Sequence, residues 1–503
     1  MRLGIIDIGS NTMRLVVWEI YGRGFYRIID EVKESVRLGS QSHDPAITSD
    51  KIKQAAVVLK EFRTFAENLL VDKTIVMATE AVRRATNRAE FLQYIGAETG
   101  YIPTVLSAEE ESYLDYFGVT SSMEVENSLM VDIGGTSTEI VWIKNNKIIE
   151  STSIPIGTLT LTEEFDLEDI VTSQNHSAMT TKLHQEFGRI PWLVGSGFKT
   201  MILVGGSART VGRIDRYRKR YPLSITHNYT LQDLDVSELF NQMMTKSAYS
   251  RSKIQGLEKS RADIIMGALG ILKTLCSLTG LSELRISGKG LREGMLYKYI
   301  KSNYDPYPDM LDASLNAILE RHRLDSNHAN HLFKLSAKLF NALMDPRDLP
   351  QSSLEILKCA ALLHDSGMSI RYYDHEVHSF YIILNSEING LNHKEILLAA
   401  LSARFHRKNN VDLSIAAYSQ LLNQMDLKIA ERLGMLVGIA EALEQNLNGI
   451  VEDLECIVTA NAVTIIPIAH QNIDIEITSV LKMKDRFQQF FKKELILVPR
   501  ING

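Results

Sequence analysis

Short apolar runs divided by polar turns fill residues 1–122, and they predict strands that alternate with helices. The runs LGIIDIG, RLVVWEI and FYRIIDEVKESV predict a three-strand meander, and KTIVMAT and IPTVLS predict two further strands. Apolar residues at helical spacing predict a helix over 49–70, capped by Thr48 or Ser49. Another helix is predicted to begin at SAEEESYLDYFGV, where Ser107 and Glu110 have the spacing of a capping box.

The same order of strands and helices is predicted again over residues 127–300. Its predicted strands are LMVDIGG, TEIVWIK and KIIESTSIP, and MILVGGSA and LRISGKG are predicted junctions between a strand and a glycine turn. The segments RLGIIDIGSNTMRLVVWEI and SLMVDIGGTSTEIVWIK correspond: each is an apolar strand that ends in Asp, a turn rich in glycine and hydroxyl residues, and a second strand. Two such halves predict an α/β fold of two actin-like lobes, of the ribonuclease H-like and sugar-kinase superfamily, with a phosphate-binding cleft between them.

The composition of these turns suits an anion with a bound cation. Glycine lets backbone N–H groups approach phosphate closely, Ser and Thr add donors, and Asp can hold a metal through water. A pair of ordinary hairpins is the alternative, but the repeated Asp and the matching flanking strands weigh against it. The predicted phosphate-binding residues are Gly9, Ser10, Asn11, Thr12, Gly134, Gly135, Thr136, Ser137, Gly205, Gly206 and Ser207. The predicted metal-binding residues are Asp132, Glu139 and Asp7.

The pattern changes near residue 303, where NYDPYPDM contains two prolines. The chain then reads as mostly helical, and its last part, from AVTIIPIAHQ to KKELIL, predicts strands and a helix. We therefore expect lobe I over 1–122, lobe II over 123–302, a helical domain over 310–448 and a small α+β domain over 449–503.

Composition and charge place few further limits. The chain has 503 residues, 45% hydrophobic and 23% charged, as in globular proteins of several domains. The chain has three cysteines without a CxxC pair, its N-terminus enters a predicted strand at once without room for a signal peptide, and no apolar run is long enough to span a membrane. These features favour a cytoplasmic protein without membrane partners. A net charge of −6 indicates no specific nucleic-acid partner, so phosphate binding must be local. The basic run over 213–220 is one possible phosphate surface, and a solvated helix end is the other interpretation.

Several ordered motifs resemble the exopolyphosphatase and guanosine pentaphosphate phosphohydrolase (Ppx–GppA) family, in its long form with an HD-like C-terminal domain. DIGSNT resembles the family's first phosphate loop, TEAVRRATN its T-x-x-x-R segment, and SAEEESYL its SGxEEARL. DIGGTSTE resembles its second loop DIGGGSTE, LVGGSART its third glycine turn, and ISGKGLREGMLY its closing LREGxLY. This chain has Thr136, Ala108 and Ser112 where the family commonly has Gly, Gly and Ala. No charged catalytic group is thereby lost.

The resemblance implies an enzyme that hydrolyses terminal phosphoanhydrides with Mg²⁺, with K⁺ as a candidate activator. Alignment of the acidic run assigns the water-activating glutamate to Glu111, with Glu110 as the alternative, and assigns phosphate neutralisation to Arg83, for which a structural salt bridge is the alternative. Inorganic polyphosphate is the leading expected substrate. Guanosine pentaphosphate (pppGpp), or a role as a phosphate or nucleotide sensor without catalysis, is the alternative. A homodimer is expected.

The helical half resembles an HD metal site in the order of its residues: His328, His364, Asp365 and Glu441. A glutamate replaces the family-like final Asp, and His375, His378, His393 and His406 lie between as further potential ligands. A second metal here and a degenerate site that only packs and lengthens a polyphosphate groove both remain open. We expect this half to set preference for substrate length rather than to perform a second hydrolysis.

Overall fold

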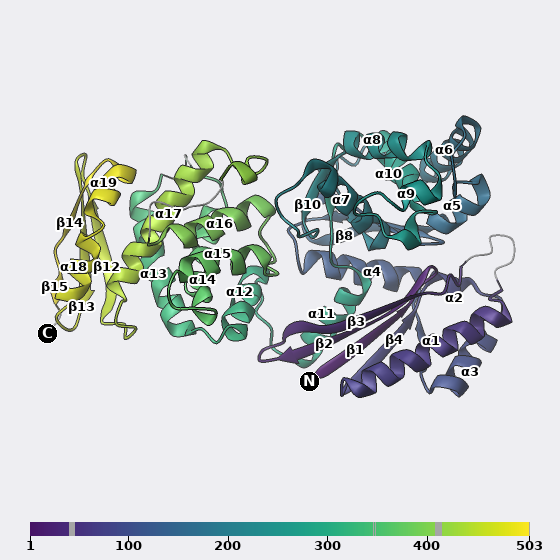
Figure 1. The fold of residues 1–503 in the computed structure, drawn as a ribbon, viewed down its shortest axis with the longest axis horizontal. Coiled ribbons are helices and arrows are strands. Elements are labelled where there is room, and N and C mark those ends of the chain that lie inside the picture. Colours follow the sequence, from purple (N-terminus) through teal and green to yellow (C-terminus); the bar gives the residue numbers. More distant parts are fainter. Residues whose placement is uncertain (40–45, 346, 348, 408–414, 502–503) are drawn as a thin grey trace. The chain divides into compact units, whose positions relative to one another are not determined.

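The computed structural model describes residues 1–39, 46–345, 347, 349–407 and 415–501. The chain forms two compact units, which are treated separately below (Figure 1). The first comprises residues 1–221 with 225–306, and the second comprises 222–224 with 307–503. No helix among the described residues combines the length and apolar character needed to cross a bilayer.

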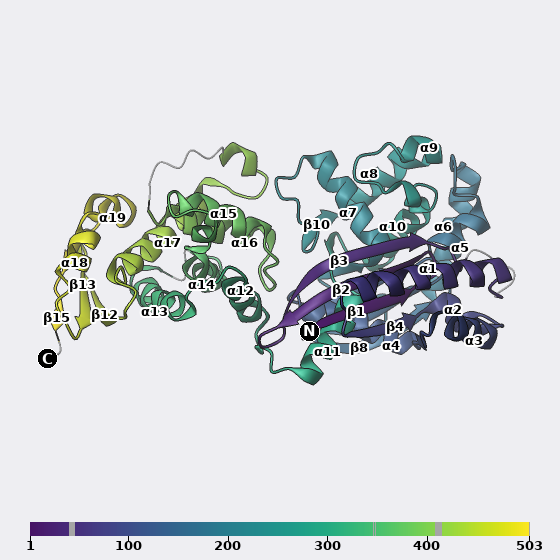
Figure 2. The same ribbon diagram turned by 60° about the horizontal axis from the view of Figure 1, so that its bottom comes forward.

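Lobe I, at the N-terminus, is built on a five-stranded sheet in the order β3-β2-β1-β4-β5. Its strands are β1 (Arg2–Ile8), β2 (Thr12–Tyr21), β3 (Phe25–Ser35), β4 (Lys73–Ala78) and β5 (Thr104–Val105). The predicted helix is α1 (Ser49–Asn68), whose N-cap Thr48 accepts a hydrogen bond from the backbone of Lys51. Figure 2 shows α1 lying along one face of the sheet, and its apolar residues enter the core there. Two further helices follow, α2 (Glu80–Arg84) and α3 (Arg88–Thr99).

Lobe II contains a six-stranded sheet in the order β10-β11-β9-β6-β7-β8. Its strands are β6 (Asn127–Ile133), β7 (Thr138–Lys144), β8 (Lys147–Ile154), β9 (Thr200–Val204), β10 (Tyr229–Gln232) and β11 (Glu283–Ile286). Its helical elements are α5 (Thr158–Phe165), α6 (Ser173–Gly188), α7 (Gly205–Lys219), α8 (Asp233–Met244), α9 (Ala248–Arg251), η1 (Lys259–Arg261) and α10 (Ile265–Thr279). Of these, α10 is the most deeply buried, because apolar residues cover nearly its whole circumference.

The strand order of one lobe repeats in the other. β1 pairs antiparallel with β2 and parallel with β4, and β6 pairs in the same way with β7 and β9. Asp7 and Asp132 occupy the penultimate position of β1 and β6, so each precedes its loop at the same station. The two-lobed fold predicted from the repeated sequence is therefore confirmed.

Two helices connect the lobes, α4 (Ala108–Thr120) and α11 (Leu291–Asn303). They approach closely because two glycines face the partner helix: a Cβ on Gly294 would lie 1.9 Å from the carbonyl oxygen of Leu114, and one on Gly118 would lie 2.6 Å from that of Gly290. Although α11 falls within the segment expected as lobe II, its residue Leu296 packs into the lobe I core. Chain order alone could not assign α11 to a lobe.

The second unit begins with six α-helices, which Figure 1 shows in green: α12 (Met310–Arg321), α13 (Ser326–Leu343), α14 (Ser353–Leu363), α15 (His375–Asn385), α16 (His393–Phe405) and α17 (Gln424–Leu443). Two short 3₁₀ helices, η3 (Ser366–Ser369) and η4 (Ile415–Tyr418), interrupt them. The last part contains β12 (Val451–Val458), β13 (Ala462–Ala469), α18 (Asp474–Leu481), α19 (Lys484–Phe491), β14 (Glu494–Leu497) and β15 (Arg500–Ile501). The sequence pattern does not predict β12, which pairs antiparallel with β13.

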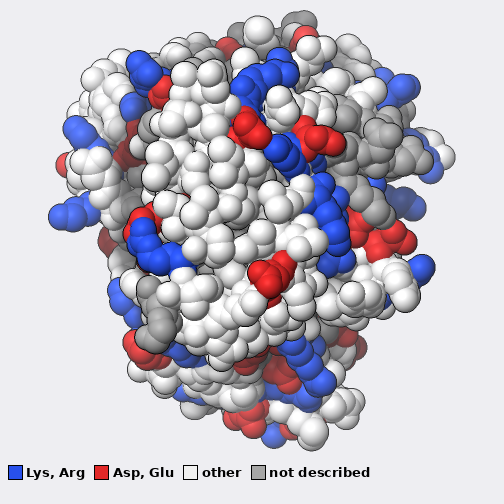
Figure 3. Space-filling view, turned by 90° about the vertical axis from the view of Figure 1, so that its left-hand side faces the viewer, with Lys and Arg blue, Asp and Glu red and all other residues white. Residues whose placement is uncertain are grey.

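One face of this last sheet is buried and the other is exposed. Strand registers place Ile457 and Ile496 on either side of Thr464, and both isoleucines are exposed. An ion pair joins Arg500 of β15 to Glu455 of β12. Figure 3 views this end of the molecule and shows a broad area with few charges, bordered by both basic and acidic side chains.

Candidate active site

A polar cavity of about 140 Å³ lies between the two lobes of the first unit. It is lined by both repeated loops, the N-terminal ends of α7 and α11, and the first turn of α4. Of the predicted phosphate- and metal-binding residues, the following line it: Asp7, Gly9, Ser10, Asn11, Thr12, Asp132, Gly134, Gly135, Ser137, Gly205, Gly206 and Ser207. Segments that lie as far apart along the chain as Asp7 and Glu293 are thus brought to one place.

The two repeated loops fold alike and contact each other. The backbone N–H of Gly9 donates to the carbonyl of Thr12 at 3.1 Å, and that of Gly134 donates to the carbonyl of Ser137 at 3.0 Å. The hydroxyls of Ser10 and Thr136 lie 2.7 Å apart in a buried hydrogen bond between the lobes. Thr136 therefore points its hydroxyl at the opposite loop and is not among the residues that line the cavity.

The third predicted glycine turn is a direct junction between a strand and a helix, since α7 begins at Gly205. Gly205 has a φ of +88°, and a Cβ there would lie 2.1 Å from Asp132 Oδ1. A Cβ on Gly206 would lie 2.1 Å from a guanidinium nitrogen of Arg261. The positive φ favours glycine at Gly205, and the lack of a side chain at Gly206 leaves room for the guanidinium of Arg261. The first N–H groups of a helix have no partner within it, so the start of α7 at the cavity favours an anion.

The structure separates the two glutamates that sequence reasoning left as alternatives. Glu110 completes a capping box with Ser107, and its carboxylate accepts from the Ser107 backbone N–H at 2.8 Å. Glu111 is 7% exposed and lines the cavity. Both carboxylates lie in the first turn of α4, but only Glu111 faces the space in which substrate could bind.

Arg83 holds Glu111 and does not line the cavity. Its Nη1 lies 2.8 Å from Glu111 Oε2 and donates to the carbonyl of Leu106, while Nε donates to Glu80 at 2.9 Å. The guanidinium donors are thus directed at protein acceptors. These contacts of Arg83 match the structural salt bridge, which is the alternative to neutralising phosphate.

Burial raises the pKa of four carboxyl groups that line the cavity: Asp7, Glu111, Asp115 and Asp132. For Glu111 the charge of Glu139 adds to the effect of burial, and Arg83 opposes it. The pKa of Asp115 is raised first by burial and then by the charge of Asp132. The charges of the protein therefore neutralise these four carboxylates only in part. Carboxylate oxygens are ligands that Mg²⁺ prefers.

Glu139, predicted as a metal ligand, lies behind the second loop. Its Oε1 accepts hydrogen bonds from Ser137 at 2.7 Å and from Ser153 at 3.0 Å, and it is not among the residues that line the cavity. Burial, followed by repulsion from Asp132, raises the pKa of Glu139 to about 7. Its position suits support of the loop more directly than contact with an ion in the cavity.

Four arginines that sequence reasoning missed line the cavity: Arg14, Arg209, Arg261 and Arg292. Burial, followed by repulsion from Arg292, lowers the pKa of Arg14 to about 10 and also lowers that of Arg209. Nη1 of Arg292 is buried without a hydrogen-bond partner. The motifs LVGGSART and LREG contain Arg209 and Arg292, so a signal was present for these two. Asp115, Glu80 and Glu293 also line the cavity and were missed.

The basic run over 213–220 is largely neutralised within the protein. Arg213 pairs with Glu258 at 2.6 Å, and both Arg218 and Lys219 pair with Asp235. Charges held in this way leave little field for a separate phosphate surface. The interpretation as a helix end is the better one, since α7 ends here.

The helical domain gathers the four residues predicted for an HD-like site and adds two more. One group comprises Asp365, His375, His406 and Glu441, and another comprises His328, His364 and Asp365, with ligand atoms within 4.8 Å of one another in each. In the part of the chain that the structure describes, no group in the cleft satisfies the same distance. His378 and His393 do not join either group.

Each of the two units is matched by the sequence profile of a known protein family. The sequence profile of the Ppx/GppA phosphatase family matches residues 16–303, and that of Ppx/GppA phosphatase domain III matches residues 311–464. Guanosine-5'-triphosphate,3'-diphosphate pyrophosphatase from Aeromonas hydrophila is 27% identical over 413 residues, with 79% of each chain covered. Its counterpart from Pseudoalteromonas atlantica is 28% identical over 394 residues, covering 75% of this chain and 74% of the relative.

Solved structures resemble a little more than half of the chain. An exopolyphosphatase from Cytophaga hutchinsonii is 25% identical, with a TM-score of 0.56, and the match covers 60% of this chain and 98% of the other. The Ppx/GppA family member from Aquifex aeolicus is 30% identical, with a TM-score of 0.52 and coverage of 60% and 99%. The profile match to lobes I and II spans more than half of the chain, and the chain belongs to the Ppx/GppA phosphatase family.

Proposed function

We propose that this protein hydrolyses the terminal phosphoanhydride of inorganic polyphosphate in the cleft between lobes I and II. The observation that carries the proposal is the convergence of four arginines, the two repeated loops and the N-terminal ends of α7 and α11 on one cavity. The unpartnered Nη1 of Arg292 is a buried donor that a phosphoryl oxygen would satisfy. Phosphoryl transfer depends mainly on such positioning and charge stabilisation.

Glu111 is the residue proposed to orient the attacking water and accept its proton. The ion pair with Arg83 engages Oε2 of Glu111 and fixes the carboxylate in the cavity wall. Because burial raises the pKa of Glu111, the group gains basicity relative to an ordinary glutamate. Since the ionised form is the base, activity should fall as the pH decreases through this raised pKa.

Mg²⁺ fits the donor set of this cavity. Asp7 and Asp132 occupy the same penultimate position of corresponding strands, burial raises the pKa of each, and both residues line the cavity. They would hold the ion together with phosphate oxygens. The ion supplies positive charge to the phosphoryl oxygens when it is bound.

We favour polyphosphate over a nucleotide as the proposed substrate because of the residues that line the cavity. The described lining contains no aromatic side chain, and its apolar side chains are Ile133, Val204 and Leu291. Stacking on an aromatic ring is a common way to hold a base, and nothing in this lining provides it. Hydrolysis of pppGpp is the second candidate, favoured by the names of the two sequence relatives. Its 5'-phosphates would occupy the same cavity and its base would lie outside.

One assay distinguishes the candidates: phosphate release from long polyphosphate, short polyphosphate and pppGpp, at matched concentrations of terminal phosphate with Mg²⁺. The proposal expects kcat/KM for polyphosphate to exceed that for pppGpp. A higher kcat/KM for pppGpp would transfer the assignment to the second candidate. Absence of release from all three substrates, with binding retained, would support a sensor instead.

A further inference from the structure

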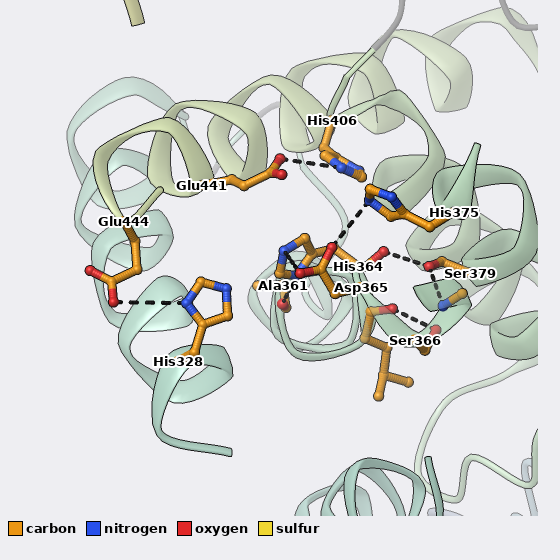
Figure 4. Close-up of polar contacts among 12 residues, drawn as sticks. His328, Ala361, His364, Asp365, Ser366, His375, Ser379, His406, Glu441 and Glu444 are labelled. Carbon is orange, nitrogen blue, oxygen red and sulfur yellow. Dashed lines mark hydrogen bonds and ion pairs between the residues drawn. The ribbon is translucent and has the colours of Figure 1, made fainter. Parts of the chain in front are cut away.

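Six side chains from five segments of the helical domain converge at one buried position (Figure 4). Three of the histidines follow or begin a helix: His364 ends α14, His375 begins α15 and His406 ends α16. All three are at most 1% exposed. His328 comes from α13, Asp365 follows His364, and Glu441 comes from α17.

The histidine rings are oriented with one nitrogen toward a backbone carbonyl. Nδ1 of His364 lies 2.8 Å from the carbonyl of Ala361, and Nδ1 of His375 lies 3.0 Å from that of Tyr372. His406 makes the corresponding contact with Ala403. Because each Nδ1–H donates a hydrogen bond to a carbonyl, the neutral ring carries its lone pair on Nε2, which is the arrangement of a histidine that binds a metal.

The Nε2 atoms face carboxylate oxygens without hydrogen-bond geometry. Asp365 Oδ1 lies 3.1 Å from Nε2 of His375, and Asp365 Oδ2 lies 3.4 Å from Nε2 of His364. Glu441 Oε2 lies 3.2 Å from Nε2 of His406. The three Nε2 atoms are buried and have no hydrogen-bond partner. Two ligands on one ion at bond lengths of roughly 2.1 Å are about 3.0–3.4 Å apart, which these separations match.

Asp365 directs its two oxygens at different histidines. Oδ1 faces His375, in the group that also contains His406 and Glu441, while Oδ2 faces His364. Figure 4 shows His328 between Glu444 and His364, with one ring nitrogen toward Glu444 and the other toward the cluster. One carboxylate therefore belongs to two ligand groups at once.

The surroundings of the cluster are arranged to hold these positions. Arg407 lies 2.6 Å from Glu441 Oε1, which leaves Oε2 toward His406. A Cβ on Gly438 would lie 2.3 Å from the carbonyl oxygen of His406, and one on Gly367 would lie 2.1 Å from that of His375. Close backbone packing thus fixes the segments that present both histidines.

We propose that this cluster binds two divalent transition-metal ions bridged by Asp365. One ion is held by Asp365, His375, His406 and Glu441, and the other by His328, His364 and Asp365. Imidazole and carboxylate together favour manganese, iron or zinc over magnesium. The sequence order suggested His328, His364, Asp365 and Glu441, whereas His375 and His406 enter from the geometry.

The test uses the full chain, stripped with a chelator, reconstituted with Mn²⁺ in the presence of excess Mg²⁺ and passed through gel filtration. Elemental analysis should give two manganese ions per chain, and electron paramagnetic resonance should show a spin-coupled pair. His406→Ala should retain one ion per chain and lose the coupling. Asp365→Ala should retain none, because both ions lose a shared ligand.

His378→Ala is the matched control, since His378 lies on α15 near the cluster but outside both groups. It should retain two coupled ions. Circular dichroism and phosphate release from the cleft should be unchanged in every variant, which separates loss of metal from loss of folding. One manganese ion in the wild type would overturn the two-ion form. No retained manganese, or equal loss in His378→Ala and His406→Ala, would overturn the site itself.

Discussion

The cleft between the lobes and the cluster in the helical domain both bury carboxylates, but with opposite effects on their pKa values. In the cleft, burial raises the pKa of Glu111, with Glu139 adding to the effect. In the metal-free helical domain, burial opposes ionisation of Asp365, but His364 and His375 in their protonated forms outweigh it and hold the pKa of Asp365 far below its usual range. Burial alone therefore does not determine the charge of a carboxyl group. The neighbouring groups decide it.

The two regions also differ in the kind of ligand that they are built to receive. The cleft combines arginines and helix N-termini with carboxylates, an arrangement that suits an anion together with a hard cation. The helical cluster presents imidazole nitrogens to carboxylate oxygens, with Arg407 paired to Glu441. If this contrast is correct, substitutions in one region should leave the chemistry of the other intact.

Glu111→Gln should have the largest effect, because the amide cannot accept the proton of water. We expect kcat on polyphosphate to fall by about 10²–10⁴, with binding retained. Phosphate release and equilibrium binding would be measured on the same preparation. Glu110→Gln is the control and should retain activity, since Glu110 only caps α4. Normal turnover in Glu111→Gln with an inactive Glu110→Gln would show that the assignment is displaced by one residue.

Glu139→Gln should change how stability depends on pH. The pKa of about 7 in the folded chain lies above the ordinary 4.5, so the stability from protonated Glu139 is complete below pH 4.5 and is lost as the pH rises through 7. The variant should gain on the order of 2–3 kcal/mol relative to wild type between pH 5 and pH 8.

Urea unfolding without Mg²⁺, at both pH values, measures this difference. Glu150→Gln, on the exposed part of β8, is the control and should shift equally at the two pH values. A pH-independent difference for Glu139→Gln as well would contradict the raised pKa. It would also weaken the contrast between the two regions.

Asp132→Asn should raise the Mg²⁺ concentration needed for half-maximal activity by about tenfold or abolish activity. The reason is that a carboxylate proposed to hold the ion becomes neutral while its size is preserved. A titration of phosphate release against Mg²⁺ measures the effect. Activity like that of wild type at low Mg²⁺ would remove Asp132 from the proposed metal site.

The hydrogen bond between Ser10 and Thr136 should contribute about 1 kcal/mol to the free energy of unfolding. A double-mutant cycle with Ser10→Ala and Thr136→Val isolates this interaction, because valine retains the buried methyl group. The free energies of unfolding would be measured for both single variants and the double variant. A coupling energy near zero would mean that the contact between the lobes is not stabilising.

His364→Ala should have the smallest effect on phosphate release, within about twofold of wild type, because His364 belongs to the other compact unit and is not among the residues that line the cleft. Initial rates on short and long polyphosphate would be compared. A large loss on both substrates would show that the helical cluster takes part in the hydrolysis. The two regions would then form one catalytic system.

The sequence by itself determined the repeated elements and their loops, because these depend on local patterns. The runs around Asp7 and Asp132 fixed strands, turns and the duplication, and Ser107 with Glu110 fixed the start of α4. Family motifs also marked Glu111, which faces the cavity. Motif spacing encodes the order of segments, so it could identify the loops that meet in the cleft.

Tertiary structure alone decided which side chains face each other. Arg261 comes from a short 3₁₀ helix without a motif, and its place in the cavity depends on the absence of a side chain at Gly206. His375 and His406 could not be distinguished from His378 and His393 by spacing, because the choice depends on where five segments of the helical domain meet. Local periodicity does not determine the directions of side chains or long-range packing. These two features decide which residues come together in the cleft and in the helical cluster.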